Sequence, residues 1–183
     1  MTDTYASPLV ERVATKDMIA LWSPQKKFST CRRCWVALAE AEQELGLPIT
    51  DEQLDEMRAH VDDIDFEAAR KFEEELRHDV MAHIHAYGAV APRAKPIIHL
   101  GATSCYVGDN TDLILIREGL ELLLGQAVNV LSRLAEFARK SRDLPTLRHT
   151  HYQPAPVGTL GKRACLWAQA ILLDDSALAR VPA

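Results

Sequence analysis

The sequence predicts an all-α protein, in which a small N-terminal helical domain precedes the first long helices of a helical bundle. Apolar residues recur at helical spacing along most of the 183 residues, and no alternating strand pattern of useful length appears. The longest helical pattern follows Asp109 and reaches Ala138, about eight turns, a length typical of bundles. We therefore place the domains at residues 1–110 and 111–183.

The first predicted helix begins at Thr30. From there apolar side chains recur every three or four residues as far as Leu45, and Gly46 followed by Pro48 ends the pattern. Cys31 and Cys34 share this apolar stripe. Both thiols are therefore expected to pack in the core.

Two further helices follow in the N-terminal domain. Thr50 and Gln53 match a reciprocal capping box, which predicts a short helix over residues 50–62. A third helix is predicted over residues 65–88, with residues 77–79 (RHD) on its polar side.

A break rich in proline separates the last two helices. The long pattern stops near Ser141, and Pro145, Pro154 and Pro156 interrupt regular structure as far as Gly158. The final helix begins there, and its pattern runs toward the end of the sequence at Ala183. We expect the sequence to end inside an architecture, since no glycine cap closes this helix.

Composition excludes several classes of protein. The net charge of -5 argues against a nucleic-acid surface, and no apolar run is long enough to span a bilayer. Four scattered cysteines do not form the framework of a secreted disulfide protein. We expect a soluble, cytoplasmic protein with no nucleic-acid or membrane partner.

Residues 97–112 (IIHLGATSCYVGDNTD) gather an imidazole, hydroxyls and glycines ahead of the long helix. Unpaired N–H groups at a helix start, with neighbouring hydroxyls, bind carboxylate or phosphate, and glycines let the backbone approach the ligand. The segment predicts a site for a small anion. The alternative is ordinary helix capping.

Six of the seven histidines lie between residues 78 and 151. Imidazole transfers protons near neutral pH, and we assign this function to His78, His99 and His151. Residues 150–153 surround His151 with hydrogen-bonding groups, and the prolines are expected to hold its loop still. For His83 and His85 we favour capping and surface polarity.

No metal or organic cofactor is expected. The spacing of Cys31 and Cys34 occurs in zinc sites, but the sequence lacks a second close cysteine pair and a His-Glu-x-x-His motif. Residues 101–108 lack the Gly-Lys-Ser/Thr ending of a phosphate-binding P-loop. A helical zinc protein remains a third and weaker hypothesis.

Three blocks together resemble the adenylosuccinate lyases of the animal type, within the fumarase and aspartase superfamily. They are residues 76–83 (LRHDVMAH), 98–104 (IHLGATS) and 150–155 (THYQPA). Similarity extends over nearly the whole chain. The resemblance implies a carbon-nitrogen lyase of purine biosynthesis, which removes fumarate from adenylosuccinate to give AMP and from the succinylated aminoimidazole carboxamide ribotide.

The resemblance also implies roles for individual residues. A base takes a proton beside a carboxylate, negative charge builds on that carboxylate, and the leaving nitrogen is protonated. By similarity His151 and His78 are catalytic, and His151 matches the general acid/base histidine. The residues implied to bind substrate are Arg12, Arg77, Asp79, His99, Thr103, Ser104 and Thr150, with Arg12 on the phosphate.

Two departures from the family pattern stand out. Val13 replaces a tyrosine that follows the phosphate-binding arginine, which removes a hydroxyl donor. The family's loop with the catalytic serine is absent, so we expect this chain to be inactive alone; family members are homotetramers whose subunits share each active site. The alternative hypothesis is a non-catalytic helical interaction module that associates with a full-length partner through exposed apolar faces.

Overall fold

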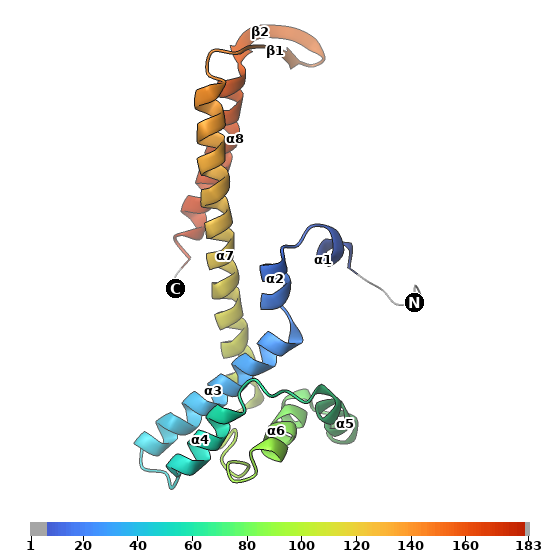
Figure 1. The fold of residues 1–183 in the computed structure, drawn as a ribbon, viewed down its shortest axis with the longest axis vertical. Coiled ribbons are helices and arrows are strands. Elements are labelled where there is room, and N and C mark those ends of the chain that lie inside the picture. Colours follow the sequence, from blue (N-terminus) through green and yellow to red (C-terminus); the bar gives the residue numbers. More distant parts are fainter. Residues whose placement is uncertain (1–6, 182–183) are drawn as a thin grey trace. The chain divides into compact units, whose positions relative to one another are not determined.

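The computed structural model describes residues 7–181 of the chain. Within them it contains the following elements: α1 (Pro8–Arg12), α2 (Lys16–Leu21), α3 (Pro24–Glu44), α4 (Asp51–Ala59), α5 (Phe66–Leu76), α6 (Asp79–Val90), α7 (Ser104–Lys140), β1 (Pro145–Thr150), β2 (Gln153–Thr159) and α8 (Leu160–Leu178) (Figure 1). The predicted all-α class is confirmed, apart from one small hairpin.

Internal contacts divide the chain into two units, which we call unit 1 (Met1–Ile116) and unit 2 (Arg117–Ala183). The division falls within α7. Unit 1 contains the helices α1 to α6 and the first turns of α7, and unit 2 contains the rest of α7, the hairpin and α8. Each unit is described separately below.

The core of unit 1 is built around α3. Trp35 is 2% exposed, and Ala39, Met57 and Tyr87 are fully buried beside it in one hydrophobic cluster. The Tyr87 hydroxyl donates to the Met57 carbonyl at 2.6 Å, which joins α6 to α4. This cluster fixes α3, α4 and α6 as the frame of unit 1.

The helices at the start of unit 1 differ from the prediction. The structure contains α1 and α2, which the apolar pattern did not predict, and α3 begins at Pro24 instead of Thr30. Ser23 caps α3 by accepting the Lys26 N–H, and Thr15 caps α2 in the same way from Met18. These helices are set by caps, which a search for apolar stripes overlooks.

Other local predictions are confirmed. Thr50 and Gln53 form the reciprocal capping box at the start of α4. Cys31 and Cys34 are buried free thiols, and the Thr111 hydroxyl contacts the Cys31 sulfur at 3.4 Å.

The single helix predicted over residues 65–88 is wrong, because the structure breaks it into α5 and α6. Arg77 takes a left-handed conformation at φ 54°, and its N–H closes α5 on the Glu73 carbonyl. His78 is extended and caps α6 by accepting the Met81 N–H. The break lets α6 turn its apolar face into the core, whereas α5 buries Ala69 alone among its residues.

The irregular break predicted after Ser141 is also wrong in part, since it contains an antiparallel hairpin. Pro145 pairs with Thr159 and Thr150 with Gln153. His151 and Tyr152 form the turn, with φ of 50° and 62°. Two successive positive φ values match the twist of a two-residue hairpin turn.

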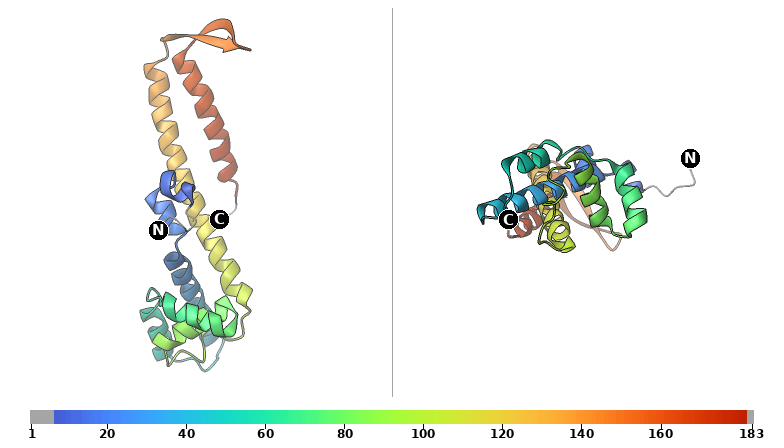
Figure 2. Two further views of the ribbon diagram at one scale, coloured as in Figure 1. Left: turned by 90° about the vertical axis from the view of Figure 1, so that its right-hand side faces the viewer. Right: turned by 90° about the horizontal axis from the view of Figure 1, so that it is seen from below.

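The helix after the hairpin ends earlier than its pattern predicts. Figures 1 and 2 show α8 turning back beside α7 at the base of the hairpin. Thr159 caps α8, which ends at Leu178, and Pro182 and Ala183 lie outside the described residues. Within residues 7–181, no helix is both long and apolar enough to cross a bilayer.

Candidate functional site

The loop before α7 brings His99 against the core of unit 1. His99 has φ 65°, a left-handed conformation that is costly for a side chain with a Cβ atom, and Gly101 has the same φ without that cost. The indole N–H of Trp35 donates to Nδ1 of His99 at 3.0 Å. The ring is half-buried and held by α3.

His78 and His99 come from separate motifs and interact electrostatically in the folded chain. Burial lowers the pKa of His99, and the positive charge of His78 lowers it further. Such an electrostatic effect requires short separation. The fold therefore joins the break between α5 and α6 to the loop before α7.

His78 has two neighbours that compete for one nitrogen. Its Nδ1 accepts the Met81 N–H at 3.4 Å and lies 3.6 Å from an Asp79 carboxylate oxygen. The hydrogen bond needs an unprotonated Nδ1 and the ion pair needs a protonated one, so the two contacts exclude each other. Both side chains are exposed to solvent.

Arg77 and Arg12 lie elsewhere on unit 1. Arg77 lines an open hollow with Arg70, Glu73 and Glu74 of α5. Arg12 is exposed at the end of α1, a helix with no buried residue, and Val13 beside it is 69% exposed. No hydrogen bond within the described residues joins either arginine to His78 or His99.

Thr103 and Ser104 stand where α7 begins. The helix starts at Ser104, five residues ahead of Asp109, so residues 104–112 are helical. Within the described residues neither hydroxyl forms a hydrogen bond, and Thr103 is exposed. Hydroxyls and N–H groups at the start of a helix are suited to an anionic ligand.

Glu42 and Trp35 also belong to this region, although no sequence motif points to them. Oε2 of Glu42 is buried without a hydrogen-bond partner in the described residues, and burial raises the pKa of this carboxyl. Its Oε1 lies 3.6 Å from the position a Cβ would take on Gly101. Both residues lie on α3, where helical spacing alone gives no sign of contact with a distant loop.

Thr150 and His151 belong to unit 2, at the tip of the hairpin. Both are exposed, and Tyr152 beside them is 98% exposed. In the described residues His151 forms no hydrogen bond, so the expected enclosure of its ring is absent from unit 2 taken alone. The turn fixes the backbone of His151 instead.

His83 differs from the expected surface or capping role. The ring is 8% exposed and stacks on Phe28, with 3.4 Å between centroids. Burial lowers its pKa to about 4, with a further contribution from Arg32. His83 is a neutral core residue, and His85 is half-buried beside Phe72.

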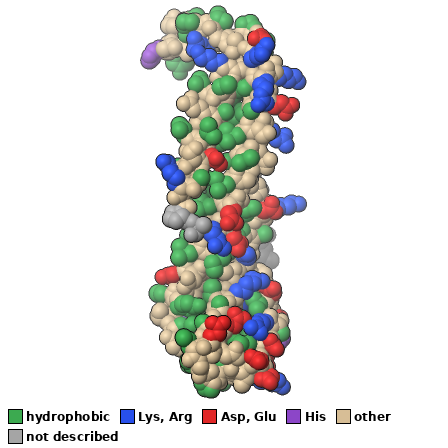
Figure 3. Space-filling view, turned by 90° about the vertical axis from the view of Figure 1, so that its left-hand side faces the viewer, with side chains coloured by type: hydrophobic (Ala, Val, Ile, Leu, Met, Phe, Trp, Pro, Cys, Tyr) green, Lys and Arg blue, Asp and Glu red, His purple; other side chains and the backbone are tan. Residues whose placement is uncertain are grey.

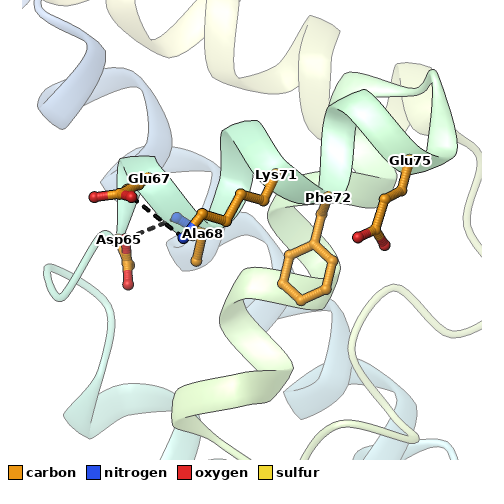
Figure 4. Close-up of a pocket in the computed structure, with 6 residues that line it drawn as sticks. All are labelled: Asp65, Glu67, Ala68, Lys71, Phe72 and Glu75. Atoms are coloured by element: carbon orange, nitrogen blue, oxygen red, sulfur yellow. Dashed lines mark hydrogen bonds and ion pairs between the residues drawn. The ribbon is translucent and has the colours of Figure 1, made fainter.

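A hollow of about 390 Å³ lies along α5 (Figure 4). Three of its four polar side chains have local partners: Asp65 caps the helix at the Ala68 N–H, and Lys71 pairs with Glu67 at 3.2 Å. This is a solvated helix face. Among the described residues, no group of three or more His, Cys, Asp or Glu side chains is arranged to hold a metal.

Comparison with known proteins relates the chain to one group of enzymes, although no family model matches it. It is 51% identical to adenylosuccinate lyase of Saccharomyces cerevisiae over 175 residues, 94% of this chain and 36% of that protein. It is 49% identical over 174 residues to adenylosuccinate lyase of Schizosaccharomyces pombe, with 93% and 36% covered. The chain thus spans about 36% of the length of these relatives.

A solved structure is similar to the chain in fold. The structure of a fumarate lyase from Mesorhizobium sp. BNC1 matches with a TM-score of 0.80 and 30% identity, over 91% of this chain and 40% of the other. The helical architecture described above is therefore shared with a fumarate lyase.

Proposed function

We propose that this chain, which is homologous to adenylosuccinate lyase over nearly all of its length, supplies part of the active site of such an enzyme. The reaction is the elimination of fumarate from adenylosuccinate to give AMP, and from the succinylated aminoimidazole carboxamide ribotide. The identity of 51% over 175 residues carries this proposal. The proximity of His78 to His99 supports it, since both belong to the blocks that carry the resemblance.

The elimination sets three tasks for the protein. A proton leaves the carbon beside a carboxylate, the developing charge on that carboxylate is stabilised, and the departing nitrogen receives a proton. We assign the last task to His151, with Thr150 beside it. Thr103 and Ser104 bind the carboxylate with hydroxyl and N–H groups. Their position at the start of α7 supports this assignment.

The remaining assignments concern the pocket around His78 and the phosphate of the substrate. His78 takes part in catalysis at the break between α5 and α6, with Arg77 and Asp79 shaping the pocket. Arg12 binds the phosphate from its exposed position at the end of α1. The aliphatic Val13 offers no hydroxyl donor beside it, which weakens phosphate binding by about 1 kcal/mol.

We also propose the organisation of the protein. Residues 1–110 form the N-terminal domain and residues 111–183 begin the bundle, which assembles as a homotetramer that shares active sites between subunits. The exposed thiols of Cys105 and Cys165 are free, which is consistent with a cytoplasmic location. Purine nucleotide is the small-molecule partner, and no cofactor takes part.

A chimera tests the proposed function. The 183 residues replace the aligned segment of the Saccharomyces cerevisiae relative, and loss of adenylosuccinate is followed by ultraviolet absorbance. We expect turnover from the chimera and none from the chain alone. His151→Gln should lower turnover about 10²-fold or more.

The matched control is His85→Gln, the same substitution at a histidine outside the proposed site. His85 is half-buried beside Phe72, so this variant should keep the turnover of the chimera. A folded chimera without turnover would contradict the proposed function. Normal turnover in His151→Gln would remove His151 from the mechanism.

One observation favours a second candidate function, a non-catalytic interaction module. Hydrophobic side chains reach the surface of the chain (Figure 3). In unit 2, Leu166, Trp167 and Leu173 are 59%, 51% and 64% exposed. Such surfaces are typical of protein interfaces. A chain that remains monomeric in size-exclusion chromatography, and fails to co-purify with the chimera, would contradict it.

A further inference from the structure

The hydrogen bond between Trp35 and His99 defines the protonation state of one ring nitrogen. The indole N–H of Trp35 lies 3.0 Å from Nδ1 of His99, and the two rings meet edge to face at 81°. An indole nitrogen donates and cannot accept, so Nδ1 must be the acceptor and carry no proton. A neutral His99 then carries its proton on Nε2.

The donor is held rigidly. Trp35 is 2% exposed in the middle of α3, and its ring lies 6.1 Å from that of the fully buried Tyr87. His99 is held from the other side by its own backbone at φ 65°. Neither partner can move freely, so the contact sets both the orientation and the tautomer of the imidazole.

The surroundings favour the neutral form of the ring. Burial and the charge of His78, at the break between α5 and α6, both lower the pKa of His99. Within the described residues Nε2 has no hydrogen-bond partner, and the ring remains partly open to solvent. His99 therefore presents an uncommitted N–H group.

We propose that Trp35 is a positioning residue that holds His99 as the Nε2–H tautomer, so that His99 donates a hydrogen bond to a carboxylate or phosphate oxygen of the substrate. This inference rests on the proposed function. It also separates the roles of the histidines: Nδ1 is blocked by the indole and Nε2 already holds a proton, so His99 does not take the substrate proton.

Nuclear magnetic resonance tests the tautomer on the chain itself. Long-range proton-nitrogen correlation of ¹⁵N-labelled protein at neutral pH should show Nδ1 of His99 without a proton and Nε2 with one. Trp35→Phe keeps an aromatic ring but removes the donor. A second tautomer should then appear, and the pKa of His99 should rise by about one unit, since Nδ1 becomes free to protonate.

Trp167→Phe is the matched control, because Trp167 is 51% exposed in unit 2 and should leave the His99 signals unchanged. Circular dichroism checks that all variants keep their helices. The proposal is overturned if Nδ1 of His99 carries the proton in the parent chain. It is also overturned if Trp35→Phe alters neither the tautomer nor the pKa.

The chimera tests the consequence for substrate. Trp35→Phe should raise KM for adenylosuccinate about tenfold with a smaller change in kcat. The reason is that a His99 ring without a fixed orientation and tautomer binds the substrate less tightly. An inactive chimera with the expected tautomer would contradict the proposed function and leave the Trp35 contact standing. An active chimera whose KM is unchanged by Trp35→Phe would overturn the positioning role.

Discussion

Gly161 lies where α8 leaves the hairpin and packs against the end of α7. A Cβ atom on Gly161 would stand 2.5 Å from the carbonyl oxygen of Ala138 and 2.6 Å from Cα of Arg142. Both are backbone atoms, which no side-chain rotation can move away. Gly161→Ala should therefore push α8 away from the end of α7 and disturb the base of the hairpin that carries His151.

The magnitude follows from these distances. An approach of 2.5 Å is about 0.9 Å shorter than the 3.4 Å at which ordinary contact begins, so the two helices must separate by nearly that amount. Overpacking of this kind costs about 1–3 kcal/mol, and alanine recovers only a few tenths of a kcal/mol as a better helix former in a first turn. We expect a net loss of about 2 kcal/mol.

Urea unfolding followed by circular dichroism measures this loss. With a slope of about 2 kcal/mol per molar urea, the midpoint should fall by about 1 M. Gly125→Ala is the control: Gly125 lies within α7, nothing stands within 4 Å of its added Cβ, and the variant should be more stable by about 0.5–1 kcal/mol. A Gly161→Ala midpoint equal to or above the parent value would refute the reasoning.

Three further predictions concern unit 1. Tyr87→Phe removes the 2.6 Å hydrogen bond to the buried Met57 carbonyl and should lower the free energy of unfolding by about 1–2 kcal/mol in urea. In the chimera, His78→Asn keeps a side-chain cap for α6 and should lose turnover without loss of thermal stability, whereas His78→Ala should lose both; full turnover in His78→Asn would exclude a catalytic role. The pKa of His83 is near 6.5 in the unfolded chain and about 4 in the native one. The free energy of unfolding should therefore fall by about 3 kcal/mol as the pH decreases between these values. Urea unfolding measures this dependence, and His83→Phe should abolish the part that comes from His83.

Features that depend on neighbouring residues could be predicted from the sequence. The capping box of Thr50 and Gln53 and the buried positions of Cys31 and Cys34 follow from side-chain chemistry and apolar spacing, and both are present. The long helix α7 follows from its pattern in the same way. The resemblance of three short blocks also indicated the group of enzymes to which the relatives belong.

Features that depend on contacts between distant residues could not be predicted from the sequence. The apolar stripe over residues 65–88 continues through the break at Arg77, and only the need for α6 to bury Ile84 and Tyr87 against α3 decides where the chain turns. The same limit applies to the hairpin. Its prolines mark a break in the helix, but the pairing of Pro145 with Thr159 is a contact between two segments.

The candidate site also combines features of both kinds. The sequence by itself determined which chemical groups are present: two histidines, two hydroxyls and glycines in short motifs ahead of helices. The tertiary structure decided which of them interact: it brings His78 into electrostatic range of His99 and sets the Trp35 N–H against Nδ1 of His99. The reason is physical: residue types and caps act over a few positions, whereas the tautomer and charge of a ring depend on atoms that only folding brings within hydrogen-bond distance.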